Sequence, residues 1–133
     1  MALAGHLLVS PVIRSKYGNK RCASTLVGRS FQSQLERNRG EVNHLRELAG
    51  EIRNLRYQVK FSLDVKGVHI TNYYADFVYE QRERKGGRKW VEIVEDTKGV
   101  RTDLYVLKYR LMLAVHGIEI QEVYAKPKRG RRA

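Results

Sequence analysis

Two aspartates and a lysine occur where two neighbouring β-strands are expected. The chain has two apolar, aromatic-rich runs, residues 73–79 and 90–94, and the polar, glycine-containing segment between them is typical of a hairpin with a long loop. Asp76 lies inside the first run, and Asp96 and Lys98 follow the second. Side chains alternate between the two faces of a strand, so Asp96 and Lys98 are expected on the same face.

These carboxylates need a partner if they are buried. A buried carboxylate costs several kcal/mol unless it is paired or bound to a cation. One explanation is a salt bridge in which Lys98 neutralises Asp96, while Asp76 points into solvent. The other is that the carboxylates bind a cation. The three residues alone leave both explanations open.

The segments around these residues resemble one nuclease family. Asp76, Asp96 and Lys98 fit the PD-(D/E)xK pattern, and their surroundings read YxADFxY, VEDxKGxxT, YxxK and HGIEIxEV. Together these segments are similar to small phage-encoded nucleases of the PD-(D/E)xK superfamily, which are described as Holliday-junction-resolvase-like. The resemblance covers roughly residues 17–123, most of the chain.

The resemblance implies a metal-dependent DNA endonuclease that hydrolyses phosphodiester bonds and leaves a 5′-phosphate and a 3′-hydroxyl. Asp76 and Asp96, with the carbonyl group of Thr97, would hold Mg²⁺, and Mn²⁺ is an alternative. Lys98 would orient or polarise the attacking water. The family also implies a homodimer that acts on branched DNA in phage recombination, because two scissile strands require two active sites.

A first helix is expected just before the strands. Ser33 and Glu36 have the spacing of a capping box, which predicts a helix from Ser33 to about Ala49, and Gly50 is a typical C-terminal stop. The apolar positions of this stretch are expected to pack inward. They are Leu45, Leu48, Ile52 and Leu55.

The first helix is also expected to contribute a third carboxylate. In the nuclease family, an FxSxxE segment carries an acid that faces the active site, and Phe31, Ser33 and Glu36 match it. On an unbroken helix, however, Glu36 lies away from the leucine positions, whereas Glu41 shares their side. Glu36 is therefore the expected third acid and metal ligand, with Glu41 in reserve. A role for Glu36 as a cap alone also remains open.

The remaining periodic segments complete an α-β-β-β-α-β order. Residues 57–65 alternate as a half-buried strand, and a turn at Lys66 and Gly67 leads into the strand that carries Asp76. These two strands and the strand that carries Asp96 are expected to form an antiparallel meander, followed by a second helix and a parallel last strand over residues 118–123. We therefore expect one α/β (α+β) domain with a mixed sheet flanked by helices. The family resemblance implies a restriction-endonuclease-like fold.

The second helix is expected over residues 104–116, capped by Thr102 or Asp103 and ended by Gly117. Its core stripe is expected to consist of Leu104, Leu107, Leu111 and Ala114 or Val115. Tyr105, Lys108 and Met112 share a different face. The match to YxxK implies that Tyr105 and Lys108 lie beside the active site and hold a phosphate.

The charge of the chain favours a polyanionic partner. Its 133 residues include 26 Lys and Arg against 14 Asp and Glu, a net charge of +12. Nucleic acid is the first candidate and an anionic membrane the second. We expect a basic N-terminal arm over residues 1–30, partly disordered, a nuclease domain over 31–124 and a basic tail over 125–133. Outside the second helix, the expected DNA contacts are Lys16, Lys20, Arg21, Lys85, Arg88, Lys126, Lys128 and Arg129.

Several other classes of protein fit the sequence poorly. No apolar run approaches the length of a membrane span, and the start lacks the features of a signal peptide. The single cysteine, Cys22, suits a reducing cytoplasm, which would be that of the bacterial host if the protein is phage-encoded. The four histidines lack zinc-site spacing, and there is no phosphate-binding P-loop. The alternatives to a junction resolvase are a nicking or restriction-type nuclease and a non-catalytic DNA-binding protein that uses the same basic surface.

Overall fold

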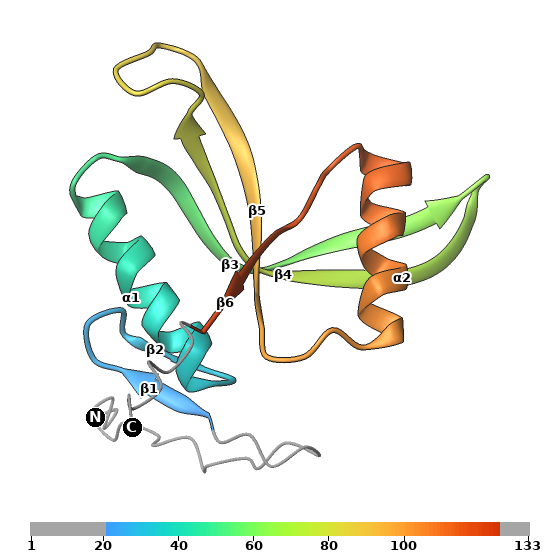
Figure 1. Cartoon of the computed structure of the whole chain (residues 1–133), viewed down its shortest axis with the longest axis horizontal. Coiled ribbons are helices and arrows are strands. Elements are labelled where there is room, and N and C mark those ends of the chain that lie inside the picture. The colour runs from blue at the N-terminus through green and yellow to red at the C-terminus, as the bar shows by residue number, and fades with distance from the viewer. Residues whose placement is uncertain (1–20, 126–133) are drawn as a thin grey trace, which may run out of the picture.

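The computed structural model describes residues 21–125 of the chain (Figure 1). Its elements are β1 (Cys22–Ser24), β2 (Arg29–Phe31), α1 (Gln34–Leu48), β3 (Ile52–Val65), β4 (Val68–Arg82), β5 (Trp90–Lys98), α2 (Asp103–Leu111), the π-helical turn η1 (Met112–His116) and β6 (Gln121–Tyr124). The expected α-β-β-β-α-β order is confirmed. The hairpin of β1 and β2 precedes it and is not predicted by the sequence pattern. Among the described residues, no helix has the length and apolar character needed to cross a membrane.

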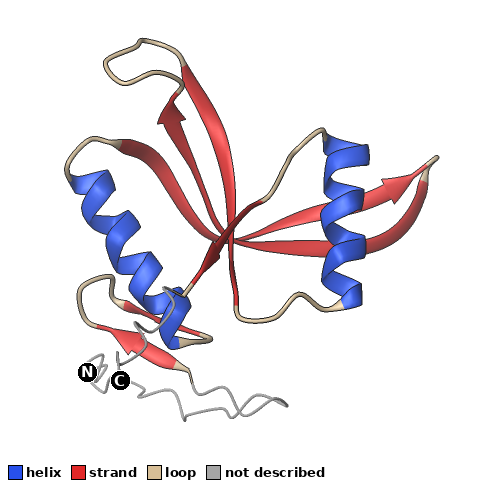
Figure 2. Ribbon diagram, in the orientation of Figure 1, coloured by secondary structure: helices blue, strands red, loops and turns tan. Residues whose placement is uncertain are grey.

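The main sheet has four strands in the order β3-β4-β5-β6. β3, β4 and β5 are antiparallel neighbours, whereas β6 runs parallel to β5. The antiparallel meander and the parallel last strand are therefore confirmed, and the domain is mixed α+β. Figure 2 shows the two helices on either side of the point where the long, twisted strands cross.

The sheet forks at the predicted acids. The pairing of β4 with β5 ends at Phe77 and Glu95, and beyond that point β4 pairs only with β3. β5 continues instead beside β6, from Glu95 to Lys98. Asp76 and Asp96 are the first residues beyond the last β4–β5 pair, so they lie where the two strands separate.

The first helix is capped as predicted, but the face that it buries is different. Ser33 is the N-cap, and its hydroxyl oxygen accepts a hydrogen bond from the backbone N–H of Glu36. Leu45 and Leu48, which were expected to pack inward, are 52% and 71% exposed. The buried positions are instead Glu36, Gly40 and Asn43, and Ile52 is buried as the first residue of β3.

The reason for this difference lies in the partners of α1. Gly40 lies against the ring of Phe31 in β2, so closely that a Cβ atom there would be 2.6 Å from the Phe31 Cζ atom. Asn43 donates a hydrogen bond to Glu95 in the sheet. Because its neighbours are a flat aromatic ring and a buried carboxylate, α1 buries a small and polar face and leaves its leucines outside.

The second helix buries a face that shares only Leu111 with the expected leucine stripe, and Ala114 and Val115 are exposed. Thr102 is the N-cap, as expected, but Leu104 and Leu107 are exposed, while Tyr105 and Met112 belong to the core. The Tyr105 ring lies under the ammonium group of Lys98, and Tyr105 and Met112 share a buried cluster with residues of the sheet. The aromatic face of α2 therefore packs against the forked end of the sheet.

The described part of the expected N-terminal arm is structured. Residues 22–24 and 29–31 pair as an antiparallel hairpin, and Phe31 joins a buried cluster with Ile52, Phe77 and Tyr79. This hairpin packs against α1 next to the pocket described below. Residues 1–20 and 126–133 lie outside the described part of the chain, so the predictions for most of the arm and for the tail concern residues that the structure does not describe.

Candidate active site

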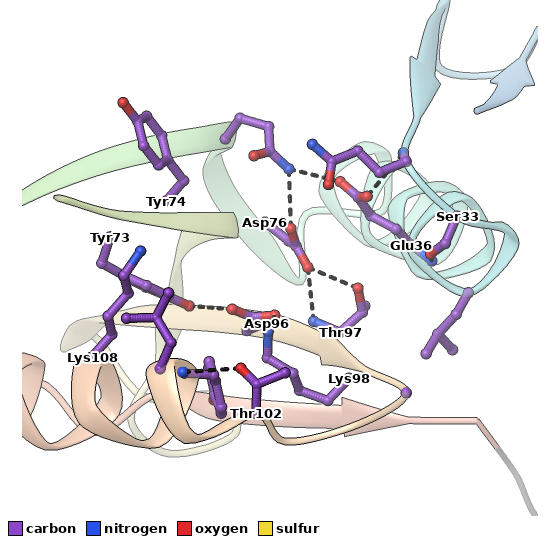
Figure 3. A pocket seen from close by; sticks show the side chains of 16 residues that line it. Ser33, Glu36, Tyr73, Tyr74, Asp76, Asp96, Thr97, Lys98, Thr102 and Lys108 are labelled. Carbon is purple, nitrogen blue, oxygen red and sulfur yellow. Dashed lines mark hydrogen bonds and ion pairs between the residues drawn. The ribbon is translucent and has the colours of Figure 1, made fainter. Parts of the chain in front are cut away.

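A pocket of about 700 Å³ lies between the start of α1, the fork of the sheet and α2 (Figure 3). It brings together side chains that are far apart in the sequence. Those predicted from the sequence and found in its wall are Glu36, Asp76, Asp96, Lys98, Tyr105 and Lys108. The two aspartates and the lysine come from the fork. Glu36 comes from α1, and Tyr105 and Lys108 come from α2.

Asp96 is almost completely buried at the base of the fork. Its Oδ2 atom accepts a hydrogen bond of 2.5 Å from the Tyr73 hydroxyl, and its Oδ1 atom lies 2.9 Å from the Lys98 ammonium group. Burial, and then the charge of Asp76, raise the pKa of the Asp96 carboxyl to about 6. The Lys98 nitrogen also lies 3.9 Å from the centre of the Tyr105 ring, a cation–π contact that fixes it over the pocket.

Asp76 reaches across the fork from β4 to β5. Its Oδ2 atom accepts hydrogen bonds from the backbone N–H of Thr97 at 2.9 Å and from the Thr97 hydroxyl at 2.7 Å. Its Oδ1 atom accepts one from the side-chain amide of Gln58 at 3.0 Å. These bonds orient the Asp76 carboxylate toward the same pocket as Asp96.

Glu36, rather than Glu41, is the helix acid in the pocket. The Glu36 side chain accepts hydrogen bonds from the backbone N–H of Gln32 at 3.1 Å and from the Gln58 amide at 2.8 Å. Burial and the charge of Asp76 raise the pKa of its carboxyl to about 7. Glu41 points elsewhere and accepts a hydrogen bond from the hydroxyl of Ser24. Glu36 therefore both caps the helix entry and faces the fork.

Sequence reasoning missed Gln58, which lines the pocket, and the role of Glu95, which is buried outside it. Gln58 joins Glu36 to Asp76, but it lies in an alternating strand segment and carries no signal of its own. Glu95 lies next to Asp96 and binds Arg39 through two hydrogen bonds, of 2.5 and 2.9 Å. The sequence shows two adjacent acids at the strand end, but only the fold shows that they have different partners.

The predicted DNA contacts are distributed over several parts of the molecule. Lys108 and Tyr105 both line the pocket, but Tyr105 is buried beneath Lys98 and donates its hydroxyl hydrogen to Glu122. Arg21 is exposed beside Ser30, and Lys85 and Arg88 are exposed on the β4–β5 loop, away from the pocket wall. The remaining candidates lie outside the described residues: Lys16, Lys20, Lys126, Lys128 and Arg129.

The donor set fits a hard divalent cation held by two carboxylates. Within residues 21–125, no three or more His, Cys, Asp or Glu side chains form a group that could hold one ion. Asp76 and Asp96 remain as a pair, and the charge of Asp76 opposes ionisation of Asp96. Mg²⁺ uses one or two carboxylates and keeps waters in its other positions, which matches this pair. A cation between them would remove their mutual repulsion.

Comparisons with protein-family models, curated proteins and solved structures find no match for this chain. The evidence for function is therefore the arrangement of the site itself. A buried Asp96, a half-buried Asp76, a lysine fixed 2.9 Å from Asp96 and an open pocket make an arrangement suited to hydrolysis at an anionic centre.

Proposed function

We propose that this protein is a Mg²⁺-dependent DNA endonuclease of the PD-(D/E)xK type with a restriction-endonuclease-like fold. One observation carries the proposal: Asp76, Asp96 and Lys98, which fit that pattern in the sequence, line one pocket at the fork of β4 and β5. A non-catalytic DNA-binding protein would gain nothing from two acids turned toward a phosphate backbone, because like charges repel.

The residues of the pocket would have different roles in hydrolysis. Asp76 and Asp96 would hold the cation, with the Thr97 carbonyl as a further donor. When bound, Mg²⁺ or Mn²⁺ would neutralise charge on the phosphodiester and favour ionisation of water. Lys98, positioned by Asp96 and by the Tyr105 ring, would orient the attacking water and offset negative charge that develops on the phosphate.

The basic surface outside the pocket would hold the DNA backbone. Lys108 lies in the pocket wall, and Lys85 and Arg88 extend from the β4–β5 loop. With a net charge of +12, these contacts would be largely electrostatic and independent of base sequence. Branched DNA, such as a Holliday junction processed in the cytoplasm of an infected cell, is the proposed substrate.

Two-fold pairing of identical chains would supply the second active site that a four-way junction requires. The outer face of α1 is a candidate interface because Val42, Leu45 and Leu48 are exposed together on it. Sedimentation with and without junction DNA tests this assembly. A species that stays monomeric in both and cuts linear duplex as fast as junctions would favour the nicking-nuclease alternative.

The decisive test is cleavage of a synthetic four-way junction beside linear duplex, splayed and single-stranded DNA. Each substrate is incubated with Mg²⁺, with Mn²⁺ and with EDTA. We expect metal-dependent cleavage with preference for the junction and none with EDTA. Tight binding to all four substrates without any cleavage would instead identify a DNA-binding protein without nuclease activity.

A further inference from the structure

The Gln58 side chain connects two acids that come from different elements. Its amide nitrogen lies 2.8 Å from Oε1 of Glu36 on α1 and 3.0 Å from Oδ1 of Asp76 on β4 (Figure 3). An amide nitrogen carries two hydrogens, so it can donate one to each carboxylate. Gln58 therefore bridges the helix acid to the sheet acid.

The backbone at Gln58 is unusual for a strand. Its φ angle is +50°, a left-handed value that few residues other than glycine adopt. The residues on either side keep regular pairing, Tyr57 with Phe77 and Val59 with Ala75, so the deviation is confined to one position. Such conformations are unfavourable for residues with a side chain and persist where the surrounding structure fixes them, often at functional sites.

Within residues 21–125, Gln58 is the side chain that hydrogen-bonds to both Glu36 and Asp76. Among the described residues, no salt bridge involves Glu36 or Asp76, and the two negative charges repel each other. Each Glu36 oxygen accepts one hydrogen bond, one from the Gln32 N–H and the other from Gln58, which together fix the orientation of the carboxyl group. Asp76 Oδ1 accepts one hydrogen bond in these contacts, which leaves it a lone pair for a cation.

We infer that Gln58 is a positioning residue through which Glu36 acts on the proposed metal site. Glu36 fixes the orientation of the Gln58 amide, and that amide holds the Asp76 carboxylate in place. Glu36 would then act on the ion through Gln58 and Asp76 instead of binding it directly. The inference rests on the proposed function, because it assumes that Asp76 binds a cation.

A double-mutant cycle tests the inference by Mn²⁺ affinity, measured by calorimetry on the full chain. The variants are Glu36→Gln, Gln58→Met and the two combined. Loss of a group that orients a metal ligand weakens affinity by about 10–100-fold. We expect each single change to weaken Mn²⁺ binding about tenfold and the double variant to be no weaker than the worse single variant. Additive losses in the double variant, or a loss for Glu36→Gln as large as for Asp76→Asn, would overturn the inference.

One control variant and the wild-type chain separate this inference from the proposed function. Gln81→Met changes a glutamine that binds Arg46 and does not line the pocket, so it should leave Mn²⁺ affinity unchanged. If Gln58→Met fails to fold, Gln58→Ala takes its place in the cycle. A wild-type chain that binds no Mn²⁺ and cuts no DNA refutes the proposed function. A chain that binds Mn²⁺ but shows additive losses refutes only the role of Gln58.

Discussion

Glu95 and Asp96 are neighbours in β5, are both almost fully buried, at 1% and 3% exposure, and have pKa values shifted in opposite directions. Burial alone would raise the pKa of Glu95, but hydrogen bonds from Arg39 and Tyr79 outweigh it and lower that pKa. For Asp96, burial and the charge of Asp76 prevail, and the pKa rises to about 6. The strand thus places the ion pair of Glu95 with Arg39 beside Asp96, a carboxylate whose burial and repulsion by Asp76 are not fully offset by its partners.

Removal of Arg39 should destabilise the protein strongly. Arg39→Ala would leave the Glu95 carboxylate buried without its cation, and breaking such a pair costs about 3–5 kcal/mol. Arg53→Ala is the matched control, because its ion pair with Glu80 is at the surface and should contribute little to stability. Urea unfolding measures both. Similar small losses for the two variants would contradict a structural role for the Arg39–Glu95 pair.

Loss of the Asp96 charge should separate binding from cleavage. Asp96→Asn removes a proposed metal ligand whose stabilisation of the transition state is worth several kcal/mol, so cleavage should fall on the order of 10²–10³-fold. DNA binding, measured by fluorescence anisotropy in EDTA, should stay equal or become tighter because a negative charge is gone. Glu41→Gln is the control outside the pocket. Undiminished cleavage by Asp96→Asn would end the nuclease proposal.

Local signals made much of this fold predictable from sequence. Ser33 and Thr102 cap their helices through hydrogen bonds to residues three positions on, so short spacing was enough to find them. The strand order followed from alternation and turn residues, and the parallel last strand from the crossover rule. The acids of the fork were found because they interrupt apolar strands.

Long-range partners explain what the sequence could not show. The buried face of α1 is polar because Asn43 meets Glu95, 52 residues away, and Gly40 meets a ring of the hairpin. A helical wheel assigns such a face to solvent and the leucines to the core. Gln58 is likewise defined by its left-handed backbone and by two acids from other elements, and neither is encoded in the alternation of its strand.

Gly40 should be intolerant of even one added methyl group. A Cβ atom at this position would lie 2.6 Å from Phe31 Cζ, and Phe31 is buried against Tyr57 and Phe77, so it cannot move aside. Overpacking of this kind costs about 1–3 kcal/mol, although alanine normally favours a helix over glycine. Gly99→Ala, with no atom within 4 Å, should be close to neutral. Thermal unfolding of both variants gives the comparison, and a stabilised Gly40→Ala would show that α1 can move away from the hairpin.

DNA binding should depend steeply on salt. If about six phosphates are neutralised, the logarithm of affinity should fall against the logarithm of salt with a slope near −5. Lys85→Ala and Arg88→Ala should each reduce that slope by about one. Arg56→Ala is a suitable control, because its guanidinium group is paired with Glu92. A slope close to zero would indicate a partner other than a polyanion.

The metal-free protein should lose stability as the pH rises from about 4.5 to about 7. Glu36 has a folded pKa of about 7 against an ordinary 4.5, and Asp96 about 6 against 3.8, so in this range the folded state binds more protons than the unfolded state. The free energy of unfolding therefore falls with rising pH, by on the order of a few kcal/mol in total. Glu95, whose pKa is lowered, loses its stabilising contribution only at lower pH.

Urea unfolding in EDTA at about pH 5, 6, 7 and 8 measures this dependence. Glu36→Gln cannot titrate, so its stability should fall less over the same range. Mn²⁺ should restore stability most at the highest pH, where Glu36 and Asp96 are both ionised and each is repelled by Asp76. A metal-free wild-type chain whose stability rises steadily from about pH 5 to pH 8 would show that Glu36 and Asp96 are ionised without cost, and that the pocket has no need of a cation.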